Sequence, residues 1–249
     1  MSDTNTKKWV MVTGGTRGIG KDIVIHLAEK YKVIFTYKNS TKEAQEVIEY
    51  CKKHKLSEVI AIQCDGCNES SVEKNCIELI KKHGSPYALI NNAGITRDSL
   101  LLKMESKAWH EVIDNNLNAT FYWTKNLLSS MVENGEGIII MMSSVSGIKG
   151  NIGQVNYSVT KAALLGFTKS LSLEVARFGI RVNAVLPGII ATDMFQTMPE
   201  KEQQKLLKNV PLKTAGSVND VSQMIEFLIS DKSVYITGQS FIVDGGMTV

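Results

Sequence analysis

The sequence predicts an α/β fold, with a single doubly wound parallel sheet of about seven strands and helices on both faces. Short runs rich in β-branched residues alternate with longer segments of helical periodicity, as crossover connections between parallel strands require. Several of the short runs are apolar almost throughout, which is typical of strands covered on both faces. The expected strands are 10–13, 33–36, 59–64, 88–91, 138–143, 181–186 and 241–243.

Helices are expected between these strands. Ser40-x-x-Glu43 and Ser70-x-x-Glu73 each fit a capping box, in which the serine and the glutamate satisfy free N–H groups at a helix start. Two longer helices are expected at about 107–131 and 154–178. The pattern contains no linker, low-complexity segment or solenoid repeat, so residues 1–249 are expected to form a single domain.

Composition excludes several classes of function. The chain has 249 residues, of which 43% are hydrophobic, and this is enough for a large core. The formal net charge is +3 and no basic stripe carries interleaved aromatics, so nucleic-acid binding is not expected. Residues 1–8 are polar without an apolar signal core, and no run of apolar residues is long enough to span a membrane. A cytoplasmic protein with no membrane association is therefore expected.

The four cysteines are expected to be buried packing residues. Cys64-x-x-Cys67 has the spacing of a redox or zinc pair, but a zinc site needs two further ligands at matching spacing. Cys51 and Cys76 lie on apolar faces of expected helices. Small buried thiols in a reducing compartment explain all four, and no metal site is expected.

A glycine-rich turn follows the first expected strand. Gly14, Gly18 and Gly20 permit a tight turn and a close approach of backbone to a pyrophosphate at a helix N-terminus. Thr16, Arg17 and Ile19 complete the turn and are expected to contact the same cofactor. A glycine-rich turn can also be merely structural, but its place between a strand and a helix favours a dinucleotide.

The residues after the second strand predict NADP(H) rather than NAD(H). Sites specific for NAD usually place an acid there, to bind the ribose 2′-hydroxyl. Here Tyr37 and Lys38 occupy the position, and the first acid is Glu43. Lys38 and Arg17 are cations where a 2′-phosphate would lie. The alternative for Lys38 is an ordinary solvated lysine.

Two further segments are expected to line the cofactor. Asp65 and Gly66 follow the third strand, where the carboxylate can accept a hydrogen bond from the adenine amino group or can cap the loop. After the fourth strand, Asn92, Ala93 and Gly94 are small enough for the chain to pass close to the cofactor.

A serine, a tyrosine and a lysine have a spacing that suits proton transfer to a carbonyl oxygen. Tyr157 and Lys161 share one face of the expected helix. The ammonium is expected to lower the pKa of the phenol, and a fall from about 10 to about 7 corresponds to roughly 4 kcal/mol. Ser144 can bind the same oxygen, with Ser143 as its competitor. Together they form an acid for ketone reduction or its reverse.

Taken in order, these motifs resemble those of the short-chain dehydrogenase/reductases, a Rossmann-type family of NADP-binding and related enzymes, over nearly the whole chain. The resemblance implies that Tyr157 protonates the carbonyl oxygen, that Ser144 binds it, and that Lys161 also holds the nicotinamide ribose. It implies that Asn116, rather than Asn115, keeps a proton-relay water in place. It further implies that the nicotinamide carboxamide is bound by the segment containing Pro187, Gly188, Ile190 and Thr192.

Finer motifs are similar to those of the 3-oxoacyl-[acyl-carrier-protein] reductases. They lie at 92–98, 150–157, 236–239 and 244–247. This resemblance implies NADPH-dependent reduction of a β-keto thioester in fatty acid or related biosynthesis. The alternatives are an acetoacetyl-coenzyme A reductase, a ketoreductase of a polyketide or aryl-polyene pathway, and a non-catalytic NADP-binding module.

Partners and accessory elements are also expected from the resemblance. A lid over the substrate is expected around 190–212, with Met194, Phe195 and Met198 either covering an acyl chain or packing as a helix face. The two long helices pair between subunits in the family that the chain resembles, and the resemblance therefore implies a homotetramer. One departure concerns the carrier, because the segment 131–136 is acidic where related reductases carry basic residues, although Arg177 remains near the second such position.

Overall fold

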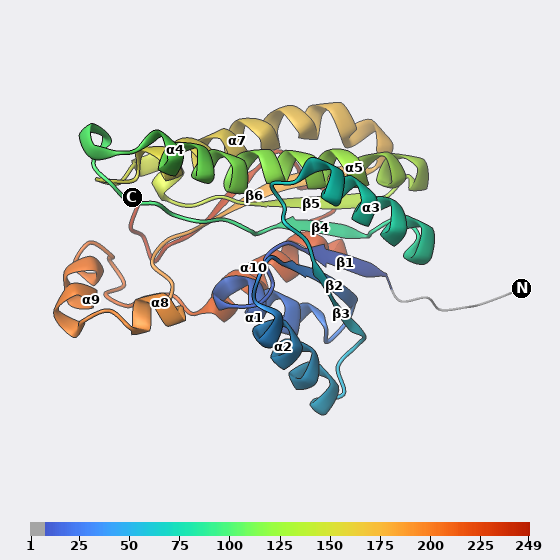
Figure 1. Ribbon diagram of the computed structural model, residues 1–249, viewed down its shortest axis with the longest axis horizontal. Helices are drawn as coiled ribbons and strands as arrows, with labels where there is room; N and C mark the ends of the chain where they lie inside the picture. Colours follow the sequence, from blue (N-terminus) through green and yellow to red (C-terminus); the bar gives the residue numbers. More distant parts are fainter. Residues whose placement is uncertain (1–7) are drawn as a thin grey trace, which may run out of the picture.

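The computed structural model describes residues 8–249, so the polar stretch that predicted no signal peptide lies largely outside the described residues. Within this range the strands form one seven-stranded parallel sheet in the order β3-β2-β1-β4-β5-β6-β7 (Figure 1). Every expected strand is present to within one residue at each end. The strands are β1 Trp9–Val12, β2 Lys32–Tyr37, β3 Val59–Gln63, β4 Ala88–Asn91, β5 Gly137–Met142, β6 Ile180–Pro187 and β7 Ser240–Val243. The predicted doubly wound parallel α/β fold is confirmed.

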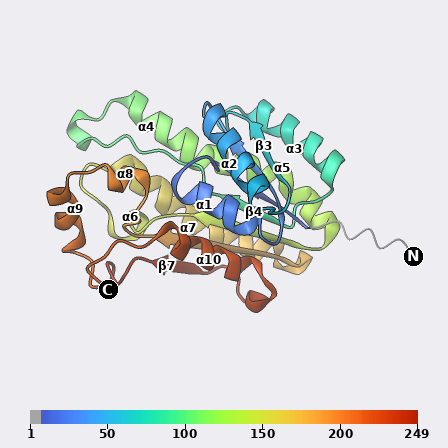
Figure 2. The ribbon, with the colours of Figure 1, turned by 90° about the horizontal axis from the view of Figure 1, so that it is seen from below.

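Helices cover both faces of the sheet because side chains along each strand alternate between the faces. Val10 and Val12 pack with α1, α2 and α10, whereas Trp9 and Met11 pack with α3, α5 and α7. Figure 2 shows α1, α2 and α10 together on the first face. The helices are α1 Gly18–Leu27, α2 Thr41–Lys53, α3 Glu69–His83, α4 Ser106–Ile113, α5 Ala119–Asn134, α6 Ser146–Lys149, α7 Val155–Val175, α8 Asp193–Gln196, α9 Glu200–Leu207 and α10 Val218–Ile229.

Both predicted capping boxes are wrong. Ser40 occupies the N-cap position of α2, but its side chain makes no capping hydrogen bond. Ser70 lies inside α3, whose N-cap is Asn68, and the Asn68 side chain accepts from the Ser71 N–H at 2.9 Å. A capping box does form at the start of α10, between Ser217 and Asp220. An asparagine two residues earlier therefore competes successfully with a serine for the cap of α3.

The helix expected at 107–131 is two helices joined by a π-helical turn. The turn spans Asp114–Asn118 and separates α4 from α5, and its closing bond runs from the Ala119 N–H to the Asp114 carbonyl. A π-helical turn accommodates one more residue than an α-helical turn and is frequent at functional sites. The buried side chain of Asn116 lies within it. The helix expected at 154–178 is α7 with a short 3-10 turn, Ala176–Phe178.

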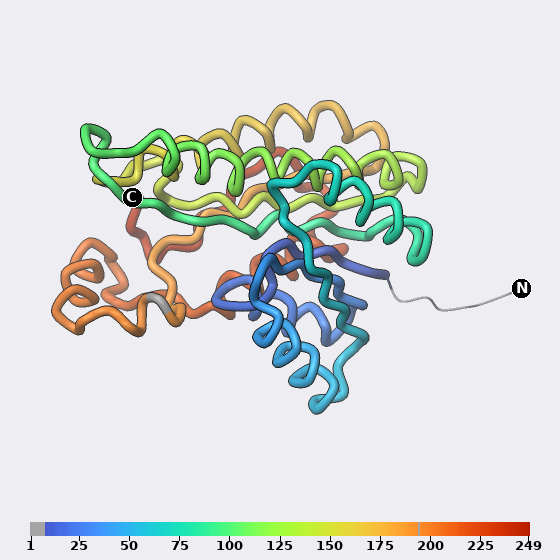
Figure 3. Tube along the Cα trace, in the orientation of Figure 1, coloured from blue at the N-terminus to red at the C-terminus, as the bar shows by residue number. Residues whose placement is uncertain are grey.

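One long excursion leaves the sheet after β6. It contains α8 and α9, which stand away from the sheet in the tube view (Figure 3). Its two ends meet at a single bridge, where the Ala191 N–H donates to the Gly216 carbonyl at 2.8 Å and the Gly216 N–H donates to the Ile189 carbonyl at 2.9 Å. Phe195 is buried and Met198 is half-buried, while the side chain of Met194 lies outside the described residues. That the excursion acts as a lid stays a prediction.

Because the sheet is parallel, all its strands end at one edge. The chain steps outward in opposite directions from β1 and from β4, so a crevice opens between them at this edge. The segments expected to bind a cofactor all follow strand ends there. None of the helices within residues 8–249 is long and apolar enough to cross a membrane.

Candidate active site

The glycine-rich turn after β1 is packed too tightly for larger residues. Gly14 has φ of 70°, in the left-handed region that favours glycine. A Cβ on Gly20 would lie 2.1 Å from the Gly14 carbonyl oxygen and 2.5 Å from Asn92 Nδ2. The Asn92 amide in turn donates to the Gly14 carbonyl at 2.9 Å. The start of α1 is therefore held close against the strand ends, and no residue larger than glycine fits at position 20.

Thr13, which the sequence-based prediction missed, joins the ends of β1 and β4. Its hydroxyl oxygen accepts from the backbone N–H groups of Asn92 and Ala93, each at 3.0 Å. The hydroxyl is buried and fixes the two strand ends that border the crevice. The available signal was a single polar residue at the end of a strand that is otherwise apolar throughout.

The cation expected to bind a 2′-phosphate already has a partner. Lys38 Nζ lies 2.7 Å from Asp65 Oδ2, and the hydrogen bond between them raises the pKa of the lysine. Burial raises the pKa of the Asp65 carboxyl, but the bonds from Lys38 and from the Cys67 N–H outweigh it and the net pKa is lowered. Both Asp65 oxygens are thus engaged, one by Lys38 after β2 and the other by the Cys67 N–H in the loop after β3. Arg17, at the N-cap of α1, is exposed and forms no ion pair with residues 8–249.

Other predicted cofactor residues divide into two groups. Thr192 lies beside the glycine turn, since a Cβ on Gly18 would sit 3.4 Å from its methyl group. Others pack within the protein. Gly66 faces the Ala119 methyl of α5, and Gly188 faces Asp244 so closely that a Cβ would lie 2.6 Å away. The remaining positions, Thr16, Ile19, Tyr37, Pro187 and Ile190, lie at the same sheet edge, and their contacts with a cofactor stay predictions.

The Asn116 side chain links the π-helical turn to the loop after β4 and to α7 through hydrogen bonds. Its Nδ2 donates to the Ile95 carbonyl at 3.0 Å and to Thr160 Oγ1 at 3.2 Å, and its Oδ1 accepts from the Ile95 N–H at 2.8 Å. Asn115 instead donates to the Glu111 carbonyl of its own helix, which selects Asn116 as the predicted member of the site. The π-helical turn thus aims Asn116 at the loop that carries Gly94.

Lys161 is buried in α7 and held at its tip. Its Nζ donates to the Met142 carbonyl at the end of β5, at 2.6 Å. Burial lowers the pKa of Lys161 to about 8. A Cβ on Gly94 would lie 3.5 Å from this Nζ, so the loop after β4 passes close beside the buried ammonium.

Ser144, and not Ser143, faces Tyr157. The Ser143 hydroxyl is buried and donates to the Lys161 carbonyl at 2.7 Å, which commits it to packing. The Ser144 hydroxyl acts on the Tyr157 phenol and lowers its pKa, and it accepts from the Ser146 N–H at 3.1 Å. Ser144 is therefore the serine on the Tyr157 side of the site, which leaves it the better placed of the two to bind a carbonyl oxygen with the tyrosine.

The expectation that Lys161 lowers the pKa of Tyr157 is wrong when only the side chains of the protein are considered. Burial raises the pKa of the phenol; the hydrogen bond from Ser144 lowers it and the Asp98 carboxylate raises it again, and the net direction is upward. The Lys161 ammonium lies 5.5 Å from the centre of the phenol ring, and it donates a hydrogen bond to the Met142 carbonyl rather than to the phenol oxygen. A raised pKa keeps Tyr157 protonated at neutral pH, which is the form that an acid needs.

The cysteines lie away from this chemistry. Cys51, Cys64 and Cys76 are buried, as expected, whereas Cys67 is only half-buried. Burial raises the pKa of Cys67 to about 11 and that of Cys76 to about 12. Thiols with such values remain protonated and weakly nucleophilic at neutral pH.

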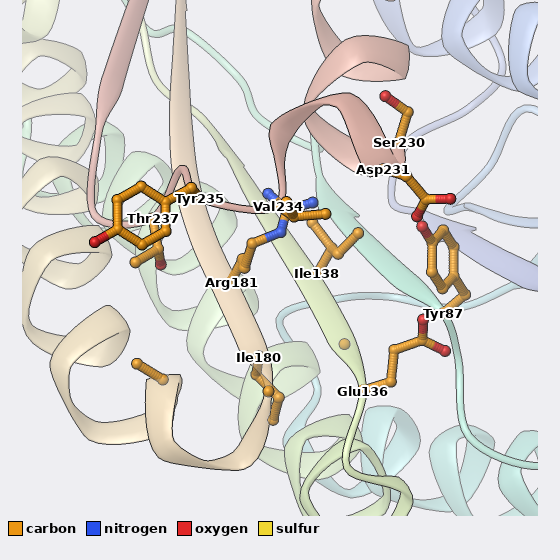
Figure 4. Close-up of a pocket in the computed structure, with 13 residues that line it drawn as sticks. Tyr87, Glu136, Ile138, Ile180, Arg181, Ser230, Asp231, Val234, Tyr235 and Thr237 are labelled. Atoms are coloured by element: carbon orange, nitrogen blue, oxygen red, sulfur yellow. The ribbon is translucent and has the colours of Figure 1, made fainter.

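A separate hollow of about 590 Å³ lies at the opposite edge of the sheet (Figure 4). Arg181 lies at its centre and donates to the carbonyls of Leu228 at 2.7 Å and Ile236 at 3.2 Å. The Tyr87 hydroxyl donates to the Ile229 carbonyl. These polar groups tie the end of α10 and the segment before β7 to the sheet, so the lining of this hollow has a structural use.

Known proteins are similar to the chain over nearly its full length. A family model described as enoyl-(acyl carrier protein) reductase matches residues 14–248. The 3-oxoacyl-[acyl-carrier-protein] reductase FabG of Staphylococcus aureus (strain Mu50) is 42% identical over 241 residues, covering 96% of this chain and 98% of that protein. The protein of the same name from Staphylococcus epidermidis (strain RP62A) is 41% identical with the same coverage. That of Buchnera aphidicola subsp. Baizongia pistaciae is 38% identical, covering 97% of this chain and 98% of that protein.

These likenesses agree with the geometry of the site. The glycine turn, the small residues after β4 and the polar groups around Tyr157 fit a nicotinamide cofactor lying across the crevice. The match extends through every segment that forms the sheet edge. The chain belongs to the short-chain dehydrogenase/reductase family of oxidoreductases, which use a nicotinamide cofactor.

Proposed function

We propose that the protein reduces a 3-oxoacyl thioester to the 3-hydroxyacyl thioester with NADPH, on an acyl carrier protein, in fatty acid biosynthesis. The observation that supports it most strongly is the grouping of Tyr157 with Lys161, whose Nζ lies 5.5 Å from the phenol ring centre, and with Ser144, while the neighbouring Ser143 hydroxyl is bonded to the Lys161 carbonyl. The relatives that are similar over nearly the whole chain are named for reduction of such a substrate.

Each residue of the site has a definite task in this reaction. The nicotinamide, when bound, supplies hydride to the carbonyl carbon. Ser144 donates a hydrogen bond to the carbonyl oxygen and orients it, and Tyr157 transfers its proton to that oxygen as the alkoxide forms. Lys161, fixed by the Met142 carbonyl, holds positive charge next to the phenolate left behind. Asn116 keeps the loop after β4 in register with α7.

The preference for NADP(H) rests on Arg17 in the first place. It is exposed at the N-cap of α1 and forms no ion pair with residues 8–249, so its guanidinium is available to a 2′-phosphate. Lys38 is bonded to Asp65, so its charge is partly neutralised for an incoming phosphate.

The segment before β5 carries less unpaired negative charge than its sequence suggests, so it is a smaller obstacle to the docking of an acidic acyl carrier protein. Glu136 pairs with Lys8 at 2.6 Å, which leaves Glu133 as the unneutralised acid of the segment within residues 8–249. An acidic carrier protein therefore meets a smaller repulsion than two free carboxylates would give. A coenzyme A thioester is the second candidate, because its binding does not require the surface of an acidic protein to approach this segment.

An interface between copies of the chain is proposed along α5 and α7. Phe121 and Phe167 line a groove of about 690 Å³ between these helices. Gly166 lies in the middle of α7, and a Cβ there would meet nothing within 4 Å. Glycine in an exposed helix interior costs about 1 kcal/mol, which close approach of a partner helix would explain. Size-exclusion chromatography with light scattering measures the molar mass and so tests for the proposed homotetramer. The mass of a monomer at micromolar concentration refutes it.

Initial rates with acetoacetyl-acyl carrier protein and acetoacetyl-coenzyme A, each with NADPH and with NADH, test the function directly. The carrier-bound substrate with NADPH is expected to give the highest kcat/KM. Tyr157→Phe is expected to abolish turnover while leaving NADPH binding intact, and Tyr235→Phe, at a fully exposed tyrosine, serves as the matched control. Absence of reduction with all four combinations, in a protein that binds NADPH tightly, refutes the proposal and favours a non-catalytic module.

A further inference from the structure

Three segments of the chain combine exposed lysines with exposed apolar side chains and contain no carboxylate. They are 99–104, 145–155 and 204–215, and together we call them the basic rim. Their lysines are all exposed, and none forms an ion pair with residues 8–249: Lys103, Lys149, Lys205, Lys208 and Lys213. The carboxylates nearest to the rim in sequence are Asp98, Glu105 and Glu202, so the rim itself carries only positive charge.

The first two segments of the rim are joined to each other beside Tyr157. The Ser99 N–H donates to the Gly153 carbonyl at 2.8 Å. Asn156, which is fully buried, donates to the Arg97 carbonyl at 3.0 Å, and its Oδ1 accepts from the Tyr157 N–H at 2.8 Å. Both segments therefore lie at the first turn of α7, the helix that carries the proposed acid.

The third segment returns to the same edge of the sheet from the excursion after β6. The Leu212 N–H donates to the carbonyl of Gly245, which follows β7, at 3.2 Å, and Val210 is buried. The Lys213 Nζ donates to the Lys208 carbonyl at 2.9 Å, so these two lysines lie close together. In both Figure 1 and Figure 2, α9 and the loop before α4 lie at the same end of the molecule. The rim therefore lies at the carboxyl edge of the sheet, where the crevice opens.

Each segment of the rim also exposes a large apolar side chain. Leu102 is 97% exposed, Ile152 is 88% exposed and Leu212 is 71% exposed. Apolar side chains gathered among unpaired lysines are typical of a surface that binds another molecule. The three segments contain no aromatic residue, so nucleic-acid bases would find nothing on which to stack. An acidic protein with apolar side chains among its carboxylates complements both features of the rim.

The acidic segment before β5 lies far from the rim. β5 begins at Gly137, just after that segment, and Ser144 follows its other end. Six residues of strand span about 20 Å, so the acids and the active site lie at opposite edges of the sheet. Arg177 precedes β6 and lies at the same far edge as the acids. A partner seated on the rim therefore reaches the site without meeting Glu133.

We propose that the basic rim is the surface on which an acidic acyl carrier protein docks to present its thioester to Tyr157. This inference rests on the proposed function and assigns the partner its place on the molecule. The lysines attract the carboxylates of the carrier and speed the encounter, while the apolar side chains are covered in the complex. The resemblance to related reductases places basic residues before β5 instead, where this chain is acidic.

Charge reversals in the rim test this proposal. One double variant, Lys205→Glu with Lys208→Glu, changes the third segment, and another, Lys103→Glu with Lys149→Glu, changes the first two. Docking is measured without turnover, by the fluorescence anisotropy of a labelled acyl carrier protein titrated with each variant. Turnover with NADPH is measured on acetoacetyl-acyl carrier protein and on acetoacetyl-N-acetylcysteamine, a small thioester without charge.

The matched control is the double variant Lys52→Glu with Lys74→Glu. Both lysines are exposed, form no ion pair with residues 8–249 and lie on α2 and α3, outside the rim. Because the control makes the same change in net charge, it separates a local effect of the rim from an effect of total charge.

Each rim variant is expected to bind the carrier about tenfold more weakly at low salt, because the reversal removes two attractions and adds two repulsions, each the size of an exposed ion pair. The difference should shrink at about 0.5 M salt, where exposed charges are screened, and kcat/KM for the carrier-bound substrate should fall in parallel with binding. Carrier binding by the control variant, and turnover of the small thioester by every variant, should stay near the wild-type values.

Unchanged carrier binding in both rim variants overturns the proposal. An equal loss of turnover on the two thioesters also overturns it, and so does a change in molar mass by light scattering, which would place the rim between copies of the chain. Because the anisotropy needs no turnover, a failure of the proposed function, seen as no reduction of either thioester by the wild type, is recognised separately.

Discussion

Replacing Lys161 by methionine is expected to stabilise the protein at neutral pH while abolishing its turnover. Burial lowers the pKa of this lysine from its ordinary value of 10.5 to about 8. The unfolded chain therefore binds the proton more tightly, and holding the ammonium in the folded state costs roughly 3 kcal/mol at pH 7. Methionine fills a similar volume without a charge. Loss of the bond to the Met142 carbonyl takes back about 1 kcal/mol, so the expected net gain is about 2 kcal/mol.

The pH dependence identifies the cause of this gain. The folded-state pKa lies below the unfolded one, so the penalty is complete below about pH 8 and disappears as pH rises toward 10.5. Urea unfolding of Lys161→Met and wild type, followed by circular dichroism, should show the full difference at pH 7 and near equality at about pH 9.5. A variant that is less stable at pH 7, or a difference that does not change with pH, would refute the assignment of a buried ammonium cost.

Three other substitutions test the framework of the site. Thr13→Val removes the acceptor of the Ala93 N–H and one of the two acceptors of the Asn92 N–H, so urea unfolding should show a loss of about 1 kcal/mol, which Thr13→Ser should restore. Gly20→Ala places a Cβ 2.1 Å from a carbonyl oxygen and should weaken NADPH binding at least about tenfold by calorimetry. Ser217→Ala removes a capping box and should cost about 1 kcal/mol in thermal unfolding, whereas Ser40→Ala should cost much less, because its side chain makes no cap bond.

The strands were predictable from the sequence because each buried strand is a short apolar run between turn residues. The helix starts were less predictable, because neighbouring polar residues compete for one cap. Asn68 and Ser70 are both suitable N-caps, and only the path of the chain from β3 decides between them. The π-helical turn at Asp114–Asn118 has no periodicity of its own, since one inserted residue leaves the apolar pattern on either side intact.

The site was predictable in its residues but not in its electrostatics. Spacing along α7 brings Tyr157 and Lys161 onto one face, but it does not show that the ammonium is directed to the Met142 carbonyl rather than to the phenol oxygen. The bond between Lys38 and Asp65 was equally hidden, because it joins the ends of two strands whose relative register the sequence does not display. Contacts between distant segments, such as those made by Thr13 and Asn116, likewise required the fold.

The bridge between Ile190 and Gly216 has a consequence for how this enzyme can change over evolutionary time. The excursion from Ala191 to Ala215 begins and ends at one pair of hydrogen-bonded residues, and within it Val210 is buried and the Leu212 N–H donates to the Gly245 carbonyl at 3.2 Å. The exposed part around α9 is therefore the part whose length the sheet constrains least, and doubling the length of a flexible loop costs only about 0.6 kcal/mol of closure entropy. Insertions and deletions there are expected to cost little in folding, whereas the same changes around Asn116 or Thr13 would break the bonds that hold the site together.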